Sequence, residues 1–355
     1  MSRDEARVSA SDAGLLHGVG LFETLLARSD EGEGVVVFDL DAHVARLLNS
    51  AAALGLSTTL RGAECRQAIV ECALRELQDT DATFVRVRLT VTGGDLNLVQ
   101  RGSAPPEHVP TILAMAQPAA TYPEEMLRAG ALAVIADWKA NPLDRFAGHK
   151  TLNYWARLQE LQRAAAKRAA EALVFQVTNH LAGGCVSNAF LVVDGVLLTP
   201  IARGEEGEVG AGASGSVGAG SDSGSNADGD VSVKEEWLDG KRLDATEGGP
   251  EGGPGGGPGS DAGGLYLPSP VLPGVTRAWV LEWARRSRIA AEKRMLTIDD
   301  VLRASELVLT NSIWGVLPVT RLERHQIGGG VPGPIGQRLV DAWRERIGDE
   351  GGEGV

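Results

Sequence analysis

The sequence lacks any apolar segment of the roughly 18 to 20 residues that a membrane-spanning helix needs, so we expect no transmembrane span. Its first residues, MSRDEARVSASD, are polar and lack the apolar stretch of a secretory signal peptide. Cysteine is scarce, and Cys65, Cys72 and Cys185 are too few and too widely spaced to indicate a disulfide framework or a zinc site. We therefore expect a soluble cytoplasmic protein with inert thiols.

The chain also lacks the basic surface of a nucleic-acid-binding protein. Its 355 residues include 47 acidic and 34 basic side chains, which give a formal net charge of −13. Residues 203–264 carry −9 of this charge, and residues 348–355 carry −3. The rest of the chain is therefore close to neutral, and we expect neither a nucleic-acid nor a membrane partner.

Residues 203–264 are predicted to form a disordered insertion. They hold 20 of the 46 glycines and almost no apolar side chain beyond Trp237 and Leu238. Such a segment buries too little apolar surface to offset the entropy lost on ordering it. The acidic residues 348–355 are predicted to be a tail outside the folded part.

Residues 1–140 have the pattern of a small α+β domain with a mostly antiparallel sheet. An apolar run, VVVFDL, leads into helical spacing over 41–56, with Asp41 as the expected N-cap. A second helix is expected over 64–78, and FVRVRLTV at 84–91 alternates as a half-buried strand does. VPTILAMAQP and GALAVIADW supply two further strands of this domain.

Residues 141–202 and 265–347 are predicted to form a second, larger domain. Several short strands are expected in the later part of 141–202, and Asp194-Gly195 is a strong hairpin signal between two of them. A long amphipathic helix is expected to begin near Lys150. Its apolar stripe would comprise Leu152, Trp155, Leu158, Leu161 and Ala165.

Seven blocks of sequence occur in an order and at spacings that together resemble one family. They are HGVGLFETLLA (17–27), DAHVARLLNSAAALGL (41–56), VRVRLTVTGG (85–94), HKTLNYWARLQ (149–159), GGCVSNAFLVVDGVLLTP (183–200), LPGVTRAWVLEWA (272–284) and SELVLTNSIWGVLPVTRLE (305–323). The chain resembles the class-IV pyridoxal-phosphate-dependent enzymes, which include branched-chain and D-amino-acid aminotransferases and aminodeoxychorismate lyase. The resemblance implies a two-domain α/β fold, with a small N-terminal α+β domain and a larger C-terminal domain around a β-barrel-like core.

The same resemblance implies a cofactor, pyridoxal 5'-phosphate, bound between the two domains of a homodimer. Lys150 matches the lysine that forms a Schiff base with the cofactor aldehyde. Such a lysine must lose its proton readily, as it does when desolvated. If the helix continues from Lys150, Tyr154 lies on the same face, near the cofactor.

Four residues match the positions that hold the cofactor phosphate in this family. Arg46 suits this role because its planar fork can bind two oxygens at once. Val275 and Thr276 would offer the free N–H groups of a helix N-terminus, and the hydroxyls of Thr276 and Ser312 would add donors.

Gly183 departs from the family pattern. The family has a glutamate five residues before the asparagine that corresponds to Asn188, and its carboxylate holds a proton on the pyridine nitrogen. The sequence offers no acidic residue between Glu171 and Asp194 to replace it. We therefore expect a ring nitrogen that stays largely unprotonated and a weaker electron sink.

The candidate substrate residues are Phe22, Arg86, Arg88, Arg101 and Tyr154. Phe22 stands where the D-amino-acid enzymes have a tyrosine that helps to hold the substrate carboxylate. Arg86, Arg88 and Arg101 are candidate partners of a carboxylate, and alternation places Arg86 and Arg88 on one face of their strand.

Three functions remain open from the sequence. The main expectation is an aminotransferase that acts on an amino acid and an oxo acid through Lys150. The first alternative is a lyase that eliminates pyruvate from aminodeoxychorismate. The second is a regulatory or interaction protein that has lost activity and uses the acidic insertion as its binding element.

Overall fold

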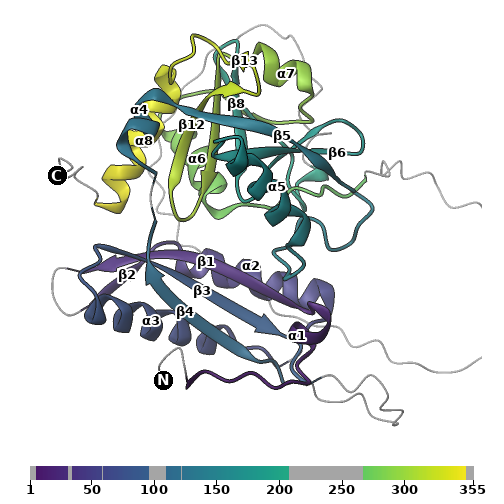
Figure 1. Cartoon of the computed structure of the whole chain (residues 1–355), viewed down its shortest axis with the longest axis vertical. Coiled ribbons are helices and arrows are strands. Elements are labelled where there is room, and N and C mark those ends of the chain that lie inside the picture. The colour runs from purple at the N-terminus through teal and green to yellow at the C-terminus, as the bar shows by residue number, and fades with distance from the viewer. Residues whose placement is uncertain are drawn as a thin grey trace, which may run out of the picture.

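The protein is described by a computed structural model in which two bodies, each built on one β-sheet, lie one above the other (Figure 1). The predicted two-part α/β architecture is confirmed. Residue Arg101, residues 349–355 and most of the expected insertion (208–266) lie outside the described residues. The structure describes residues 5–30, 34–57, 59–95, 109–120, 122–207 and 267–348.

The N-terminal body is an antiparallel sheet with two helices against one face (Figure 1). Within the described residues its strand order is β2-β1-β3-β4. Val85, Val87, Leu89 and Val91 of β3 are all buried under the helices, as their alternation predicted. The elements are α1 (Ala13–His17), β1 (Gly20–Ser29), β2 (Val35–Val37), α2 (Leu40–Leu54), α3 (Gly62–Asp79), β3 (Phe84–Thr92) and β4 (Ile112–Pro118).

Helix α2 is amphipathic and buries Val44, Leu47 and Ala51 against the sheet. It begins one residue before the expected cap, because Asp39 adopts a left-handed conformation (φ 55°) that turns the chain into the helix. Asp41 lies in the first turn instead, where a carboxylate is favoured by the helix dipole.

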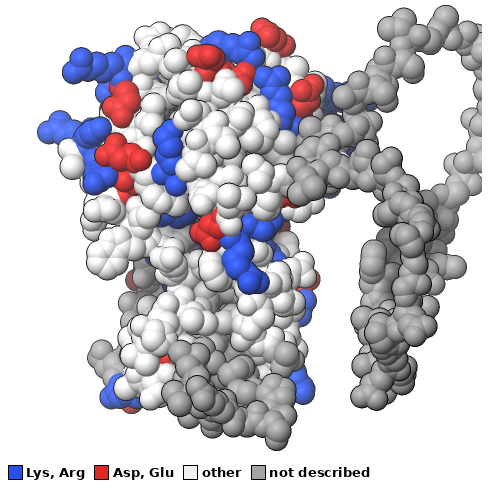
Figure 2. Space-filling view, turned by 90° about the vertical axis from the view of Figure 1, so that its right-hand side faces the viewer, with Lys and Arg blue, Asp and Glu red and all other residues white. Residues whose placement is uncertain are grey.

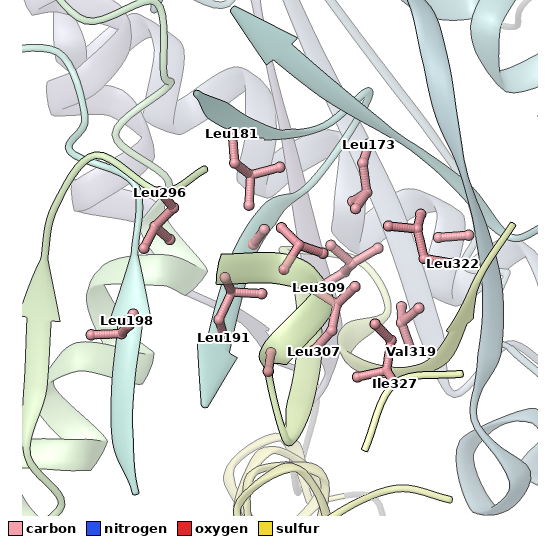
Figure 3. Close-up of a cluster of buried hydrophobic side chains, with 14 of the residues drawn as sticks. Leu173, Leu181, Leu191, Leu198, Leu296, Leu307, Leu309, Val319, Leu322 and Ile327 are labelled. Atoms are coloured by element: carbon pink, nitrogen blue, oxygen red, sulfur yellow. The ribbon is translucent and has the colours of Figure 1, made fainter. Parts of the chain in front are cut away.

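The C-terminal body is a curled mixed sheet with helices outside it (Figure 1). In the described part of the chain it has nine strands, ordered β10-β9-β8-β11-β12-β5-β6-β7 with β13 beside β12. Side chains such as Leu173, Leu191 and Leu309 point toward one another inside the curl (Figure 3). The elements are α4 (Glu124–Ala129), β5 (Ala131–Ala140), α5 (Trp155–Ala166), β6 (Glu171–Gln176), β7 (Leu181–Gly184), β8 (Asn188–Val193), β9 (Val196–Thr199), α6 (Val275–Arg286), β10 (Ala291–Lys293), α7 (Ile298–Arg303), β11 (Glu306–Asn311), β12 (Gly315–Leu322), β13 (His325–Gln326) and α8 (Pro334–Ile347).

Strand β5 belongs to the second sheet, although we expected it in the first. It pairs in parallel with β12 and β6. The chain passes from one body to the other between β4 and α4 (Figure 1). Apolar content marks 131–140 as a strand, but it carries no information about which sheet provides its partners.

The β8–β9 hairpin is confirmed, since Asp194 and Gly195 both have positive φ (52° and 79°) in a two-residue turn. The long helix differs from expectation. Helix α5 begins at Trp155, because residues 150–152 are held in extended form by backbone hydrogen bonds with β1. The expected apolar stripe is also wrong, since Trp155 is 80% and Leu158 is 52% exposed.

Charged side chains of both signs are intermixed on the face shown in Figure 2. In the part of the chain that the structure describes, no helix is long and apolar enough to cross a membrane. The same residues contain no group of three or more His, Cys, Asp or Glu side chains arranged to hold a metal ion.

The structure describes Arg203 to Gly207, which we had assigned to the expected insertion, and Glu205 among them contacts α6. Arg277 is only 2% exposed, and its guanidinium donates twice to the Glu205 carboxylate (2.8 and 3.0 Å). The carboxylate of Glu206 accepts from the Ser269 N–H at 2.6 Å. The described residues that flank 208–266 are therefore tied to the folded part on both sides.

Replacing Glu205 with Ala should destabilise the fold by about 3 kcal/mol, because it leaves the Arg277 charge buried and unpaired. The pKa of Glu205 is lowered to about 2, since Arg277 outweighs the opposing effect of burial. Its stabilisation is thus complete above about pH 4.5 and is lost as the pH falls toward 2. Urea unfolding at pH 7 checks this, with Glu282→Ala, an exposed ion-pair residue, as the control. Equal stability of the two variants would contradict it.

Candidate active site

A pocket of about 490 Å³ lies between the two bodies and brings most of the predicted site residues together. Gly183 does not line it, although Ala182 and Gly184 do, and Arg101 lies outside the described residues. Predicted residues that line the pocket are Phe22, Arg46, Arg86, Arg88, Lys150, Tyr154, Val275, Thr276 and Ser312.

Lys150 projects into this pocket from the extended segment beside β1. The Phe22 N–H donates to the Lys150 carbonyl at 2.9 Å, and the Lys150 Nζ lies 4.5 Å from the centroid of the Phe22 ring. Burial lowers the pKa of the Lys150 amine to about 7, and nearby guanidinium groups, with Arg46 foremost, lower it too. Glu23 opposes this shift. The amine is therefore largely neutral just above neutral pH, as a nucleophile requires.

Glu23 fixes Arg46 from behind the pocket. Arg46 Nε and Nη2 donate to the two Glu23 oxygens at 2.9 and 2.6 Å, and Nη1 donates to the Pro273 carbonyl at 3.0 Å. His43 Nδ1 lies 2.7 Å from the same carboxylate. Burial alone would raise the pKa of Glu23, but Arg46 and His43 lower it to about 2, so the carboxylate stays ionised. We had not predicted a role for Glu23.

The N-terminus of α6 supplies backbone donors at one end of the pocket. Gly274 precedes the helix without a side-chain cap, and a Cβ there would lie 1.8 Å from the Asn188 Oδ1, so the position requires glycine. Asn188 Nδ2 in turn donates to the Leu272 carbonyl at 2.9 Å. The first N–H groups of α6 have no acceptor inside the helix and can bind an anion.

Hydroxyl groups complete this anion cradle. The Oγ1 of Thr276 lies 3.3 Å from the Oγ of Ser312. The Ser312 turn is fixed by the Asn311 Oδ1, which accepts from the N–H groups of Ile313 and Trp314. Thr310, which we had not predicted, also lines the pocket, and its buried Oγ1 finds no hydrogen-bond partner among the described residues.

These residues fit a phosphate group. The cradle offers helix N–H groups and three hydroxyls, which can donate to phosphate oxygens. The Arg46 fork is bound to Glu23, contrary to the expectation that it binds two phosphate oxygens, so only the remaining Nη hydrogens of Arg46 can serve the phosphate. An unpaired buried hydroxyl is costly, so the Thr310 hydroxyl is itself suited to an added acceptor. No Asp or Glu lines the pocket within the described ranges.

Gly183 has a backbone that only glycine adopts readily. Its φ is 133°, and a Cβ would lie 2.8 Å from the Ser187 carbonyl oxygen. Glu171 lies behind the same wall, 1% exposed and outside the pocket. Its carboxylate accepts from three backbone N–H groups and the Ser187 hydroxyl, which leaves it without a free direction toward the pocket.

Aromatic and basic side chains form the opposite wall. Phe22 and Tyr154 meet edge to face at 5.2 Å, and the Arg88 guanidinium lies 3.8 Å from the Phe22 ring centroid. Arg86 and Arg88 both face the pocket from β3. Tyr154 reaches it as the residue preceding α5, not by sharing a helix with Lys150.

Arg157 is a further pocket residue that the sequence did not reveal. It lies one helical turn after Tyr154, and its Nη1 donates to the carbonyls of Cys185 (3.0 Å) and Gly184 (3.3 Å). Its spacing from Tyr154 could have suggested that the two side chains lie close together. That spacing does not predict a pocket residue unless the position of residues 184 and 185 is also known.

Comparison with known proteins identifies the family. The family described as amino-transferase class IV matches residues 20–205 and 260–322, which is more than half of the chain. The chain belongs to the class IV aminotransferases. Enzymes of this family use pyridoxal 5'-phosphate, the phosphate-bearing cofactor that the cradle fits.

Individual relatives are distant but span nearly the whole chain. D-alanine aminotransferase from Bacillus licheniformis is 24% identical over 98% of this chain and 94% of its own. The branched-chain aminotransferase structure from Escherichia coli has a TM-score of 0.70 at 21% identity, covering 99% and 94% of the two chains. For 4-amino-4-deoxychorismate lyase from Pseudomonas aeruginosa the TM-score is 0.66 at 24% identity, covering 96% and 95%. The predicted class-IV fold is thereby confirmed.

Replacing Glu23 with Gln should weaken both the fold and cofactor binding, because it leaves the Arg46 charge without its partner. We expect a loss of about 3 kcal/mol in unfolding free energy and a higher dissociation constant for pyridoxal 5'-phosphate. Asp41→Asn is the control. Asp41 lies in α2, the helix that carries Arg46, and forms an exposed ion pair with Arg66. Unchanged cofactor affinity in the Glu23 variant would show that Arg46 is positioned without it.

Proposed function

We propose that this class IV aminotransferase binds pyridoxal 5'-phosphate through Lys150 and transfers the amino group of an amino acid to an oxo acid. The observation that carries the proposal is the amine of Lys150, buried beside an anion cradle with its pKa lowered to about 7. A neutral amine attacks an aldehyde, and the cradle would hold the phosphate at the other end of the same molecule.

Each residue has a distinct part in this proposal. Arg46, the N-terminus of α6 and the hydroxyls of Thr276 and Ser312 would hold the phosphate. When bound, the cofactor supplies an electron-withdrawing ring that stabilises negative charge at the substrate α-carbon. Lys150 would move the proton at that carbon, because it is the titratable amine of the pocket and its pKa lies near neutral pH.

The substrate carboxylate would bind at Arg86 and Arg88, which face the pocket from β3. Guanidinium groups suit a carboxylate, and no Asp or Glu among the described residues lines the pocket beside them. Phe22 presents a ring without a hydroxyl at this wall, so carboxylate binding would depend on charge. A D-amino acid is thus the less favoured substrate, because the tyrosine expected for it is missing.

We also propose that the active form is a homodimer. Leu15, Leu16, Trp155 and Leu158 expose 52–80% of their surface. Trp155 and Leu158 line a surface hollow that shares Leu152, Tyr154 and Leu158 with the active-site pocket, and a second chain would cover this apolar surface. Sedimentation should then give twice the chain mass of 37.2 kDa. A mass of one chain at micromolar concentration would refute this.

Lys150→Ala should abolish the visible absorption band of the bound cofactor and its covalent fixation by borohydride. In the unaltered protein the rate of cofactor incorporation should rise with pH around a midpoint near 7, since only the neutral amine reacts. Lys167→Ala, at an exposed lysine paired with Glu323, should behave as the unaltered protein. Retained absorbance in the Lys150 variant, or a midpoint near the usual lysine value of about 10.4, would refute the assignment.

Product analysis separates the main reaction from the lyase alternative. A transferase converts an amino acid to its oxo acid only when a second oxo acid accepts the amino group. Release of pyruvate from aminodeoxychorismate without any acceptor would instead establish the lyase. Cofactor uptake with neither reaction on a panel of amino acids would support the regulatory alternative.

A further inference from the structure

Arg157 presents a cation at a wall of the pocket where no carboxylate faces it. Its Nη1 is held by the carbonyls of Gly184 and Cys185, and its guanidinium lies 5.3 Å from the Trp138 ring centroid and 5.7 Å from that of Tyr154. No ion pair to Arg157 occurs within the described residues. The charge is thus positioned by neutral groups and stays unneutralised.

The neighbouring charged groups are already engaged elsewhere. Glu160, one turn further along α5, binds Arg163 and the Asp137 N–H. The Glu171 carboxylate already accepts hydrogen bonds from the N–H groups of Cys185 and Val186 and from the Ser187 hydroxyl, in the turn that follows β7. Burial raises the pKa of the Cys185 thiol to about 12 and also raises that of Tyr154, so both stay neutral.

The covalent structure of the cofactor indicates which part would meet this wall. In pyridoxal 5'-phosphate the ring nitrogen is para to the carbon that bears the aldehyde, so it points away from the lysine that binds the aldehyde. With the phosphate in the cradle and the aldehyde at Lys150, the ring nitrogen would approach the wall formed by Arg157 of α5 and residues 184–187, while Phe22, Arg86 and Arg88 form another wall of the pocket. The wall with Arg157 is also the one where the family glutamate was expected.

We propose that Arg157 faces the ring nitrogen of the cofactor and keeps that nitrogen unprotonated. The inference rests on the proposed function and deepens it. A pyridinium beside a guanidinium would place two like charges together, so the neutral ring is favoured. The backbone at Gly183 excludes a ready return of the glutamate, which makes the arrangement a built feature of this wall.

A neutral ring withdraws electrons less strongly than a pyridinium. The cationic pocket compensates in part, since Arg46, Arg88 and Arg157 all favour negative charge on whatever the pocket holds. We therefore expect weaker stabilisation of negative charge at the substrate α-carbon than a protonated ring would give. The proposed role of Arg157 is thus to set the protonation state of the ring nitrogen.

The test is the ¹⁵N chemical shift of pyridoxal 5'-phosphate labelled at the ring nitrogen, bound to the full chain and recorded against pH. The unaltered protein should show an unprotonated nitrogen at neutral pH. Arg157→Glu should raise the titration midpoint of the nitrogen by about 1–3 pH units, and Arg157→Gln by less. Arg157→Lys should retain the unaltered behaviour. Arg163→Gln, which removes the same charge from an outward position of α5, is the matched control.

A protonated nitrogen in the unaltered protein overturns the inference, as does a midpoint in Arg157→Glu and Arg157→Gln that equals the midpoint in Arg163→Gln. The glutamine variant keeps the test decisive if the glutamate variant fails to fold. Failure of the unaltered protein to bind the cofactor would overturn the proposed function itself. Binding through Lys150 with a protonated nitrogen would leave that function intact and refute only the role of Arg157.

Discussion

The site depends on one buried carboxylate, that of Glu23. It lies behind the pocket and binds Arg46 through both oxygens, so a single charge fixes the guanidinium that lies next to the anion cradle. The same carboxylate is the one nearby charge that raises the pKa of Lys150. Without Glu23, burial and the charges of Arg46, Arg88 and Arg157 would lower the pKa of the Lys150 amine further. Glu23 thus couples the position of one cation to the protonation of another.

The pocket itself is unbalanced in charge. Arg46, Arg86, Arg88, Lys150 and Arg157 line it, and no carboxylate does so within the described residues. Arg46 is paired with Glu23 and the pKa of Lys150 is lowered to about 7, so the unpaired charges among these described lining residues are those of Arg86, Arg88 and Arg157. Their proximity is unfavourable until anions enter, and a cofactor phosphate and a substrate carboxylate are anions of the required kind. Ligand binding should therefore relieve repulsion among the pocket cations, which adds to the affinity gained from direct hydrogen bonds.

The sequence predicted the fold well, because the fold depends on short patterns, and most of the predicted site residues line one pocket in the structure. Alternation in β3, the Asp194-Gly195 turn and the Gly274–Thr276 helix start are local, and the structure has each of them. The failures are of another kind. The sheet that takes β5 is decided by partners far away in the chain, and backbone bonds to β1 set the start of α5.

The same reason explains the residues that were missed. Glu23, Thr310 and Arg157 acquire meaning only from what surrounds them, since each is an ordinary strand or helix residue by its spacing. Arg86 and Arg88 were expected on one face of β3, but only the second body shows that this face lines the pocket. The alternation of side chains along a strand predicts which face of the sheet each one lies on. It does not predict which other part of the protein packs against that face.

The tie formed by Glu205 and Arg277 has a consequence for the architecture of the chain. Arg277 directly follows Thr276, so the ion pair with Glu205 shares one helical turn with the anion cradle. Glu206 accepts from the Ser269 N–H, so the described residues on the two sides of 208–266 are also bonded to each other. These contacts connect the chain that follows strand β9 directly to the start of α6, and they place the cradle relative to the C-terminal sheet without any contribution from residues 208–266.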